Sequence, residues 1–173
     1  MDERFPIGHF KVEGVISAEQ REAWIRDIEE LPVRAQEAVQ GLSAEQLDIP
    51  YRDGGWSSRQ VVHHMADSHM NSYIRFKLAL TEDVPTIRPY YEDRWAELND
   101  YTADVSVSLA LLAALHTRWA ILLRSLSDEE YKRTFHHPES GQTLPLEYHL
   151  GVYSWHGRHH TAHITSLRKK LGI

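Results

Sequence analysis

Apolar residues recur at helical spacing in four long stretches of the chain, and no long stretch alternates with the period of a strand. The four stretches cover residues 18–40, 58–80, 106–126 and 145–171. Residues three and four positions apart share one face of a helix, so each stretch predicts a helix with an apolar face. Four such helices joined by loops of unequal length indicate an all-α protein built as a four-helix bundle.

Capping signatures mark where the helices are expected to begin. Ser17, Ser43 and Ser57 are each followed three residues later by glutamine. In this pattern the serine and glutamine side chains satisfy the free amide groups at the start of a helix. Thr143 and Pro145 predict the start of the last helix in another way, as an N-cap and a first-turn proline.

The third stretch, residues 106–126, is apolar almost all round. That pattern is typical of a central helix, so we expect most of its surface to be buried, with a dimer seam as an alternative for part of it. Its longest unbroken apolar run, residues 109–115, is far too short to span a bilayer. The sequence therefore predicts no membrane partner.

Length and composition indicate one soluble globular domain. The chain has 173 residues, of which 42% are hydrophobic and 25% charged, enough to bury a core. We expect residues 1–173 to form a single domain, with residues 1–16 as an arm on its surface. The formal net charge of -6 argues against a nucleic-acid partner. The N-terminal residues lack the apolar core of a signal peptide, so a cytoplasmic protein is the expectation.

Cysteine is absent from the sequence, whereas histidine occurs 12 times. The absence of thiols excludes disulfides, thiolate metal sites and a cysteine nucleophile. Eight histidines fall within two predicted helices, namely His63, His64, His69, His149, His156, His159, His160 and His163. Imidazoles three or four residues apart on a helix can share a metal ion.

Helical phase separates the histidines of the last helix. His156 and His160 lie on a stripe that continues through Ile164 and Leu167, so this stripe should face the core. His159 shares its line with residues that end in lysines and is expected on the outer flank. His149 and His163 are expected at the pocket wall or beside a ligand. His156 and His160 are therefore the better inward pair.

The third ligand is expected from the helix over residues 58–80. His64 is in phase with apolar positions on that helix, whereas the line through His63 begins and ends with charged residues. We therefore choose His64, with the adjacent His63 as the alternative. Asp67, one turn further on, is placed to accept a hydrogen bond from an imidazole.

Two sequence segments carry a family resemblance. Residues 54–82 read G-G-W-S-S-R-Q-V-V-H-H-M-A-D-S-H-M-N-S-Y-I-R-F-K-L-A-L-T-E, and residues 153–164 read Y-S-W-H-G-R-H-H-T-A-H-I. Both segments closely resemble the YfiT branch of the DinB-like superfamily. The opening F-P-I-G-H-F and the later Y-Y-E-D-R-W-A-E-L are similar to the same branch, so the resemblance covers nearly the whole chain.

The resemblance implies a four-helix bundle in up-down-down-up order, often a homodimer, with one divalent metal ion on three histidines. Its ligands would fall on the His63–His64 pair, His64 being preferred, and on His156 and His160. It implies a metal-dependent hydrolase with zinc or nickel. Related proteins are S-transferases and isomerases that use small thiols such as bacillithiol or mycothiol.

Three functions remain open at this point. The first is a hydrolase in which a metal ion held by three histidines activates water against a small-molecule substrate. The second is a metal-dependent thiol (bacillithiol) S-transferase, for which a pocket with cationic groups is expected; the candidates are Arg75, Lys77, Arg88 and Arg158. The third is a non-enzymatic metal-binding bundle whose histidines serve stability.

Overall fold

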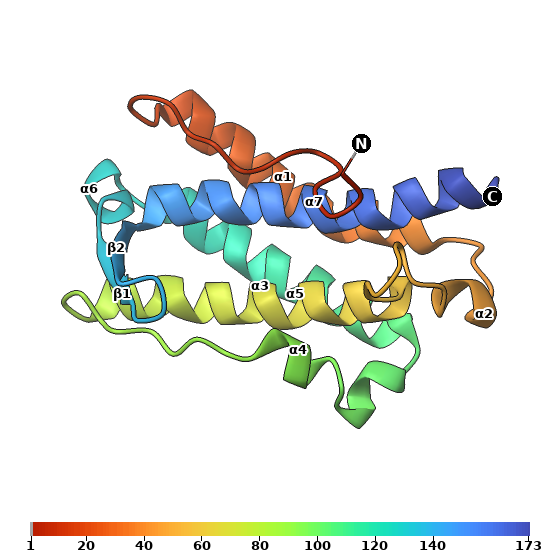
Figure 1. Cartoon of the computed structure of the whole chain (residues 1–173). Coiled ribbons are helices and arrows are strands. Elements are labelled where there is room, and N and C mark those ends of the chain that lie inside the picture. Colours follow the sequence, from red (N-terminus) through yellow and green to blue (C-terminus); the bar gives the residue numbers. More distant parts are fainter. Residues whose placement is uncertain (1) are drawn as a thin grey trace.

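The protein is described over residues 2–173 by a computed structural model, and four long helices lie side by side in it (Figure 1). These are α1 (Ala18–Val39), α3 (Ser58–Thr81), α5 (Val105–Ser125) and α7 (Leu146–Leu171). The connections carry α2 (Ala44–Leu47), α4 (Glu92–Trp95), α6 (Asp128–Tyr131), the strands β1 (Thr134–His137) and β2 (Gln142–Pro145), and a 3₁₀ turn, η1 (Asn99–Thr102). The predicted all-α four-helix bundle is confirmed.

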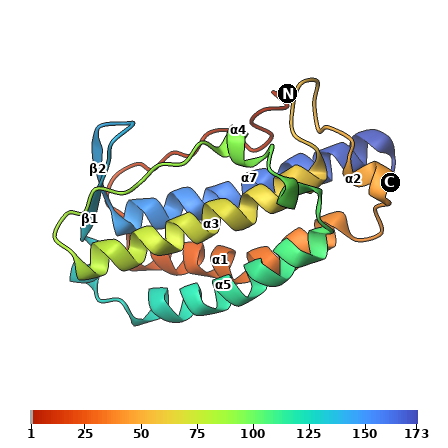
Figure 2. The same ribbon diagram turned by 90° about the horizontal axis from the view of Figure 1, so that it is seen from below.

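The order of the helices is up-down-down-up. Helix α1 packs against α7 and α5, and α3 packs against the same two helices. Helices α1 and α7 run in one direction, whereas α3 and α5 run in the other (Figures 1 and 2). Because α3 and α5 are parallel, the chain between them returns along the length of the bundle. In Figure 2 this connection, which carries α4, runs along α3 and α7.

The capping signatures identify the helix starts, with one exception. Ser43 and Ser57 form complete capping boxes, and the Ser17 side chain accepts from the backbone N–H of Gln20. The exception is the last helix, where Pro145 is the N-cap and Thr143 lies in β2, paired with His136. The β1–β2 hairpin uses the backbone of Thr143, so this residue cannot cap α7.

Helix α1 continues through Pro32 instead of ending there. A proline inside a helix has no N–H to donate, which frees the carbonyl four residues earlier. Here that carbonyl belongs to Ile28, and it accepts a hydrogen bond from Nδ1 of His116 on α5. His116 is 1% exposed, so a buried imidazole from the neighbouring helix satisfies the carbonyl that Pro32 leaves free.

Helix α5 differs from expectation, since only one of its faces is buried. Leu112, Trp119 and Leu123 point into the core, but Val107 and Ile121 are 62% and 67% exposed. The helix is long and apolar enough to cross a membrane by length and composition alone, contrary to the estimate from its longest apolar run. Here it packs against α1 and α3 as one of the four bundle helices. Its outer face is therefore an apolar surface that residues 2–173 leave uncovered.

The N-terminal arm lies against α7 and α1. The indole N–H of Trp155 donates to the carbonyl of Gly8 at 3.0 Å, and Nε2 of His163 donates to the carbonyl of Arg4 at 3.1 Å. Phe10 meets Trp24 edge-on. These contacts place the arm over one side of the histidine-rich part of α7.

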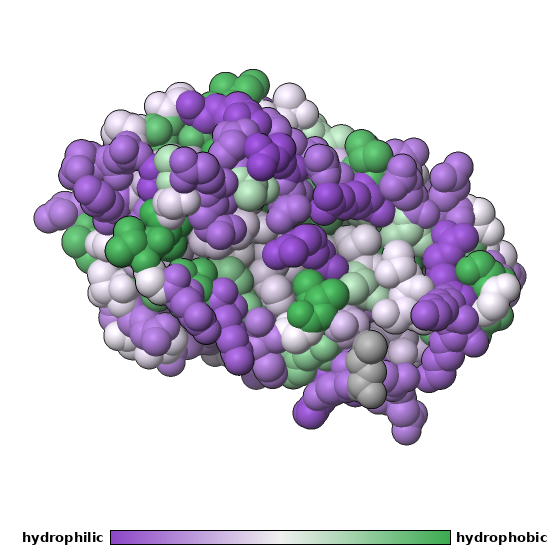
Figure 3. Space-filling model, turned by 90° about the horizontal axis from the view of Figure 1, so that it is seen from above, coloured by the Kyte–Doolittle hydropathy of each residue, from purple (hydrophilic) through white to green (hydrophobic). Residues whose placement is uncertain are grey.

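The face seen in Figure 3 is mainly hydrophilic, with hydrophobic residues in separate small groups.

Candidate metal centre

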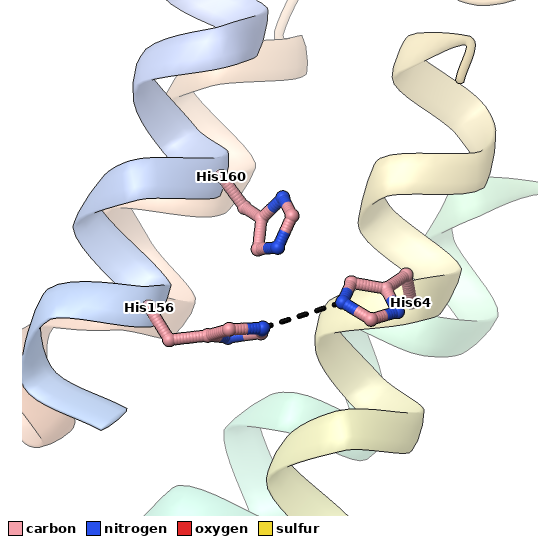
Figure 4. Close-up of side chains that lie close together, drawn as sticks. All are labelled: His64, His156 and His160. Atoms are coloured by element: carbon pink, nitrogen blue, oxygen red, sulfur yellow. Dashed lines mark hydrogen bonds between the residues drawn. The ribbon is translucent and has the colours of Figure 1, made fainter. Parts of the chain in front are cut away.

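Three imidazoles converge between α3 and α7. His64 extends from α3, and His156 and His160 extend from successive turns of α7 (Figure 4). One nitrogen of each ring lies within 4.8 Å of the others, and the Nε2 atoms of His64 and His156 are 3.3 Å apart. The structure thus brings together the three residues that were chosen from helical phase.

The spacing of these nitrogens can be compared with that of a tetrahedral metal site. Imidazole nitrogens bind zinc at about 2.0–2.1 Å, so two of them at a tetrahedral angle lie about 3.3 Å apart. The distance between His64 Nε2 and His156 Nε2 is the same. Three imidazoles on one side of an ion leave a fourth position for water or substrate. The donor set and the spacing of this pair therefore fit a divalent metal ion of this kind.

His63, the alternative ligand, is directed elsewhere. Its Nδ1 lies 2.7 Å from the hydroxyl of Ser108, and its Nε2 lies 3.1 Å from the carbonyl of Ala103. Both ring nitrogens are thus bonded to groups in or beside α5. His63 therefore links α3 to α5 by hydrogen bonds, whereas the adjacent His64 faces α7.

Asp67 does not accept a hydrogen bond from an imidazole within residues 2–173, so this expectation was wrong. Its carboxylate accepts instead from the hydroxyl of Tyr101, at 2.7 Å. Burial raises the pKa of Asp67 and also that of Tyr101. The loop that contains η1 brings Tyr101 to this position, and helical spacing on α3 could not indicate that neighbour.

Burial keeps the imidazoles of the trio neutral. The pKa of His64 falls to about 4, mainly because burial penalises the charged ring, and the nearby rings of His159 and His163 add to the effect. The pKa values of His156 and His160 are lowered well below the usual value for the same reason. A neutral imidazole offers a lone pair, so all three side chains are in the protonation state that a metal ion requires.

His69 forms a hydrogen bond with the ring nitrogen of His156 that points away from His64. Its Nε2 lies 3.1 Å from Nδ1 of His156, and His69 is fully buried. If Nε2 of His156 held a metal ion, its Nδ1 would carry the proton and would donate to His69. Such a bond fixes the tautomer and the orientation of a ligating imidazole. His69 therefore takes the role that Asp67 was expected to have.

The remaining histidines of α7 surround the trio. His159, expected on the outer flank, is only 6% exposed, because the arm places Phe5 at 5.7 Å and Trp155 stacks on it at 4.4 Å between ring centroids. His163 lies beside His160, with the two Nδ1 atoms 3.4 Å apart. His159, His160 and His163 form a second group whose nitrogens lie within 4.8 Å of one another.

His149 lies deeper in the bundle than the wall of the pocket. Its Nε2 is 3.0 Å from the hydroxyl of Ser72, and the ring packs edge-on against Phe135. Burial lowers its pKa well below the usual value. His149 is thus a core residue and does not line the cavity beside the trio.

A cavity of about 400 Å³ opens onto the trio. Its wall is formed by side chains of α3 and α7, by the loop before α3, by the connection that returns along the bundle, and by the tip of the β1–β2 hairpin. These side chains include Trp56, Arg75, Tyr90, His137, Glu139 and His159. The volume is within the range of small-molecule sites. A small substrate can therefore reach the position that the three histidines leave open.

The buried histidines predict that the protein loses stability in acid. This effect can be tested at His116, which lies on α5 and is not one of the three histidines of the trio. Burial lowers the pKa of His116 to about 4, whereas an unfolded histidine titrates near 6.5. Between pH 4 and 6.5 the unfolded state thus binds more protons than the folded state. The contribution of His116 to the free energy of unfolding is therefore complete above pH 6.5 and falls as the pH approaches 4. The expected loss over the window is about 3 kcal/mol.

The substitution His116→Asn keeps a donor for the carbonyl of Ile28 but removes the titrating group. In metal-free protein, urea unfolding between pH 4 and 7 should show an acid limb that is shallower by about 1.4 kcal/mol per pH unit than in the unsubstituted protein. Equal slopes in the two proteins would show that His116 does not titrate in this way.

The class of protein is defined by these features: a four-helix bundle in up-down-down-up order with a largely buried trio of histidines on its second and fourth long helices. The chain belongs to the DinB superfamily, whose model matches residues 27–164. The resemblance seen in the sequence is therefore confirmed.

Named relatives cover almost the whole chain. A Bacillus subtilis protein named "Putative metal-dependent hydrolase YfiT" is 56% identical, over 97% of this chain and 95% of its own length. A relative of the same description from Bacillus cereus strain B4264 is 58% identical, over 98% of both chains. The solved structure of YfiT from Bacillus subtilis, described as a probable metal-dependent hydrolase with an unusual four-helix bundle topology, aligns with a TM-score of 0.97 at 54% identity, covering 99% of each chain.

Proposed function

We propose that the protein is a metal-dependent hydrolase that binds one divalent metal ion per chain through His64, His156 and His160. The observation that carries this proposal is the convergence of three neutral imidazoles, whose nitrogens lie within 4.8 Å of one another. The names of the relatives support the same class. Zinc is the metal we propose, because it favours three imidazoles and an open fourth position, and nickel is the alternative.

The residues of the chain have distinct roles in this proposal. A divalent metal ion supplies a Lewis acid and lowers the pKa of a water molecule to about 7. His64, His156 and His160 hold their lone pairs toward one point, and His69 keeps the proton of His156 on Nδ1. Trp56 packs against His64, with 4.6 Å between the ring centroids, and forms part of the cavity wall. The substrate would lie in the cavity beside the trio.

The reaction can be tested with protein loaded with zinc or nickel against a panel of small esters, amides and phosphoesters. We expect metal-dependent turnover of at least one class and its loss in the variant His160→Ala. Hydrolysis that persists at the same rate in metal-free protein, or none in the whole panel, would contradict the proposal.

A thiol S-transferase is the second candidate. The observation in its favour is a cavity that joins the trio to the cationic side chain of Arg75, while the chain itself contains no cysteine nucleophile. Addition of bacillithiol with monochlorobimane to the metal-loaded protein should then produce the conjugate faster than the uncatalysed reaction. A rate equal to that of the uncatalysed reaction would exclude this candidate for these substrates.

The non-enzymatic alternative makes a different prediction for the same histidines. If they served only stability, the variants His156→Ala and His160→Ala would lose melting temperature together with the metal. We expect loss of the metal with little change in the melting temperature of the metal-free protein. That combination would support a functional site.

We also propose that the outer face of α5 forms a homodimer. Val107, Leu111 and Ile121 are exposed on this face, which runs along the outside of the bundle (Figure 2). A second copy can cover an apolar helix face through twofold symmetry. Ile121→Glu is expected to shift sedimentation to the monomer, whereas Val15→Glu, at a 95% exposed position in the arm, should not. A dimer that survives Ile121→Glu, or a monomeric unsubstituted protein, would contradict this proposal.

A further inference from the structure

The guanidinium group of Arg75 is buried, and the described part of the chain, residues 2–173, places no counter-ion beside it. Arg75 is only 8% exposed, although it carries a full positive charge. Within residues 2–173 it forms no ion pair, and its buried Nε atom has no hydrogen-bond partner. Burial of a charge without a partner opposes folding, so a buried arginine is normally paired with a carboxylate or phosphate. The expected anion is not supplied by this part of the chain.

Arg75 lines the same cavity as the histidine trio. It follows His64 by 11 residues on α3, which is three helical turns, so both side chains lie on one face of the helix. Their Cα atoms are about 16 Å apart by the helical rise, and the arginine side chain leans back toward the start of the helix. The cavity thus has the three imidazoles at one end and, at the other, a cation that residues 2–173 leave without an ion pair.

A second unpartnered group lies near Arg75. His137, on β1, lines the cavity, and its Nδ1 is also buried without a hydrogen-bond partner among the described residues. Burial lowers the pKa values of His137 and His149, and the positive charge of Arg75 lowers them further. The two acidic residues of the cavity wall, Glu92 and Glu139, are both exposed.

We propose that Arg75 is the binding site for an anionic group, a carboxylate or a phosphate, on the substrate or co-substrate that reaches the histidine trio. The planar guanidinium donates two parallel hydrogen bonds to either group, and the ligand would provide the counter-ion that the fold lacks. His137 would donate a further hydrogen bond from its edge of the cavity. This inference rests on the proposed function, because it assumes that the trio holds a metal ion.

Binding can be measured without turnover, with cobalt(II)-loaded protein as the reporter. The probes are mercaptoalkanoates with chains of three to six carbons, each paired with the mercaptoalcohol of equal length. The thiolate of each probe is expected to change the visible spectrum of the cobalt ion. We expect the carboxylate of the best-fitting length to improve affinity by about 10- to 100-fold over its neutral partner.

Three variants make the assignment specific. Arg75→Met should remove the preference for the carboxylate, whereas Arg75→Lys should retain part of it. Glu139→Gln should keep the whole preference, because Glu139 forms no ion pair with Arg75. Inorganic phosphate is used as a competitor, and stronger competition by phosphate than by acetate would assign the site to phosphate-bearing ligands.

Equal affinities for the two probe series in the unsubstituted protein would overturn the inference, as would a preference that persists in Arg75→Met. A gain in carboxylate preference in Glu139→Gln would also overturn it, because it would show that Glu139 occupies the site. Failure of the underlying metal site would be recognised separately, since cobalt(II) would then give no bound spectrum before any probe is added.

Discussion

The variant His64→Ala is expected to bind zinc at least about 100-fold more weakly than the unsubstituted protein, because it loses one of three ligands. The adjacent variant His63→Ala should bind zinc almost normally. Isothermal titration of metal-free protein with zinc measures both affinities. The comparison is closely matched, since the two histidines are neighbours on α3 and both are buried.

Stability should change in the opposite order. His63 makes hydrogen bonds with Ser108 and Ala103, so His63→Ala should lower the free energy of unfolding by about 1–3 kcal/mol. His64 has no hydrogen-bond partner at Nδ1 within residues 2–173, and its removal should cost the metal-free protein less. If His63→Ala abolished zinc binding while His64→Ala preserved it, the assignment of these two residues would be reversed.

The bundle could be predicted from the sequence because its helices have regular apolar faces and clear capping residues. Ser57 and Gln60 define the start of α3, and the phase of the helix then places His64 inward. The outward face of α5 could not be predicted, because an apolar residue such as Ile121 gives no indication of whether a neighbour covers it. The sequence indicates only that residues 132–137 could pair briefly; the partner strand β2 gives no alternating pattern, since the strands are only four residues each.

The second large effect is expected from His69→Leu, which removes the hydrogen-bond acceptor for Nδ1 of His156. The orientation of His156 would no longer be fixed, and metal affinity should fall by about 10- to 100-fold. The volume of leucine preserves the packing of the buried site, so the fold should be retained. Zinc titration measures the affinity, and circular dichroism checks the helix content.

His69→Gln is the matched control. The amide oxygen of glutamine can accept the same hydrogen bond from His156, so most of the metal affinity should return. A merely structural role for His69 would reduce stability in both variants without a difference in zinc affinity between them. Equal zinc affinity in His69→Leu and the unsubstituted protein would show that this hydrogen bond does not orient the ligand.

The site itself was predicted only in part. Helical phase identified His64, His156 and His160, because each of them lies on a face that also carries core residues. The hydrogen-bond partner of His156, His69, was not predicted. His69 lies on an apolar face of α3, and this position could have indicated a buried polar residue. Tyr101 and the arm over His159 come from distant segments, and the pattern of one helix contains no information about them.

The most direct test of the metal centre is a crystal structure of zinc-loaded protein, with the ion located by its anomalous signal. We predict one zinc ion per chain, at about 2.0–2.1 Å from a nitrogen of each of His64, His156 and His160, with the fourth position open to the cavity. An ion bound instead by His159, His160 and His163, or an empty trio at saturating zinc, would contradict the account.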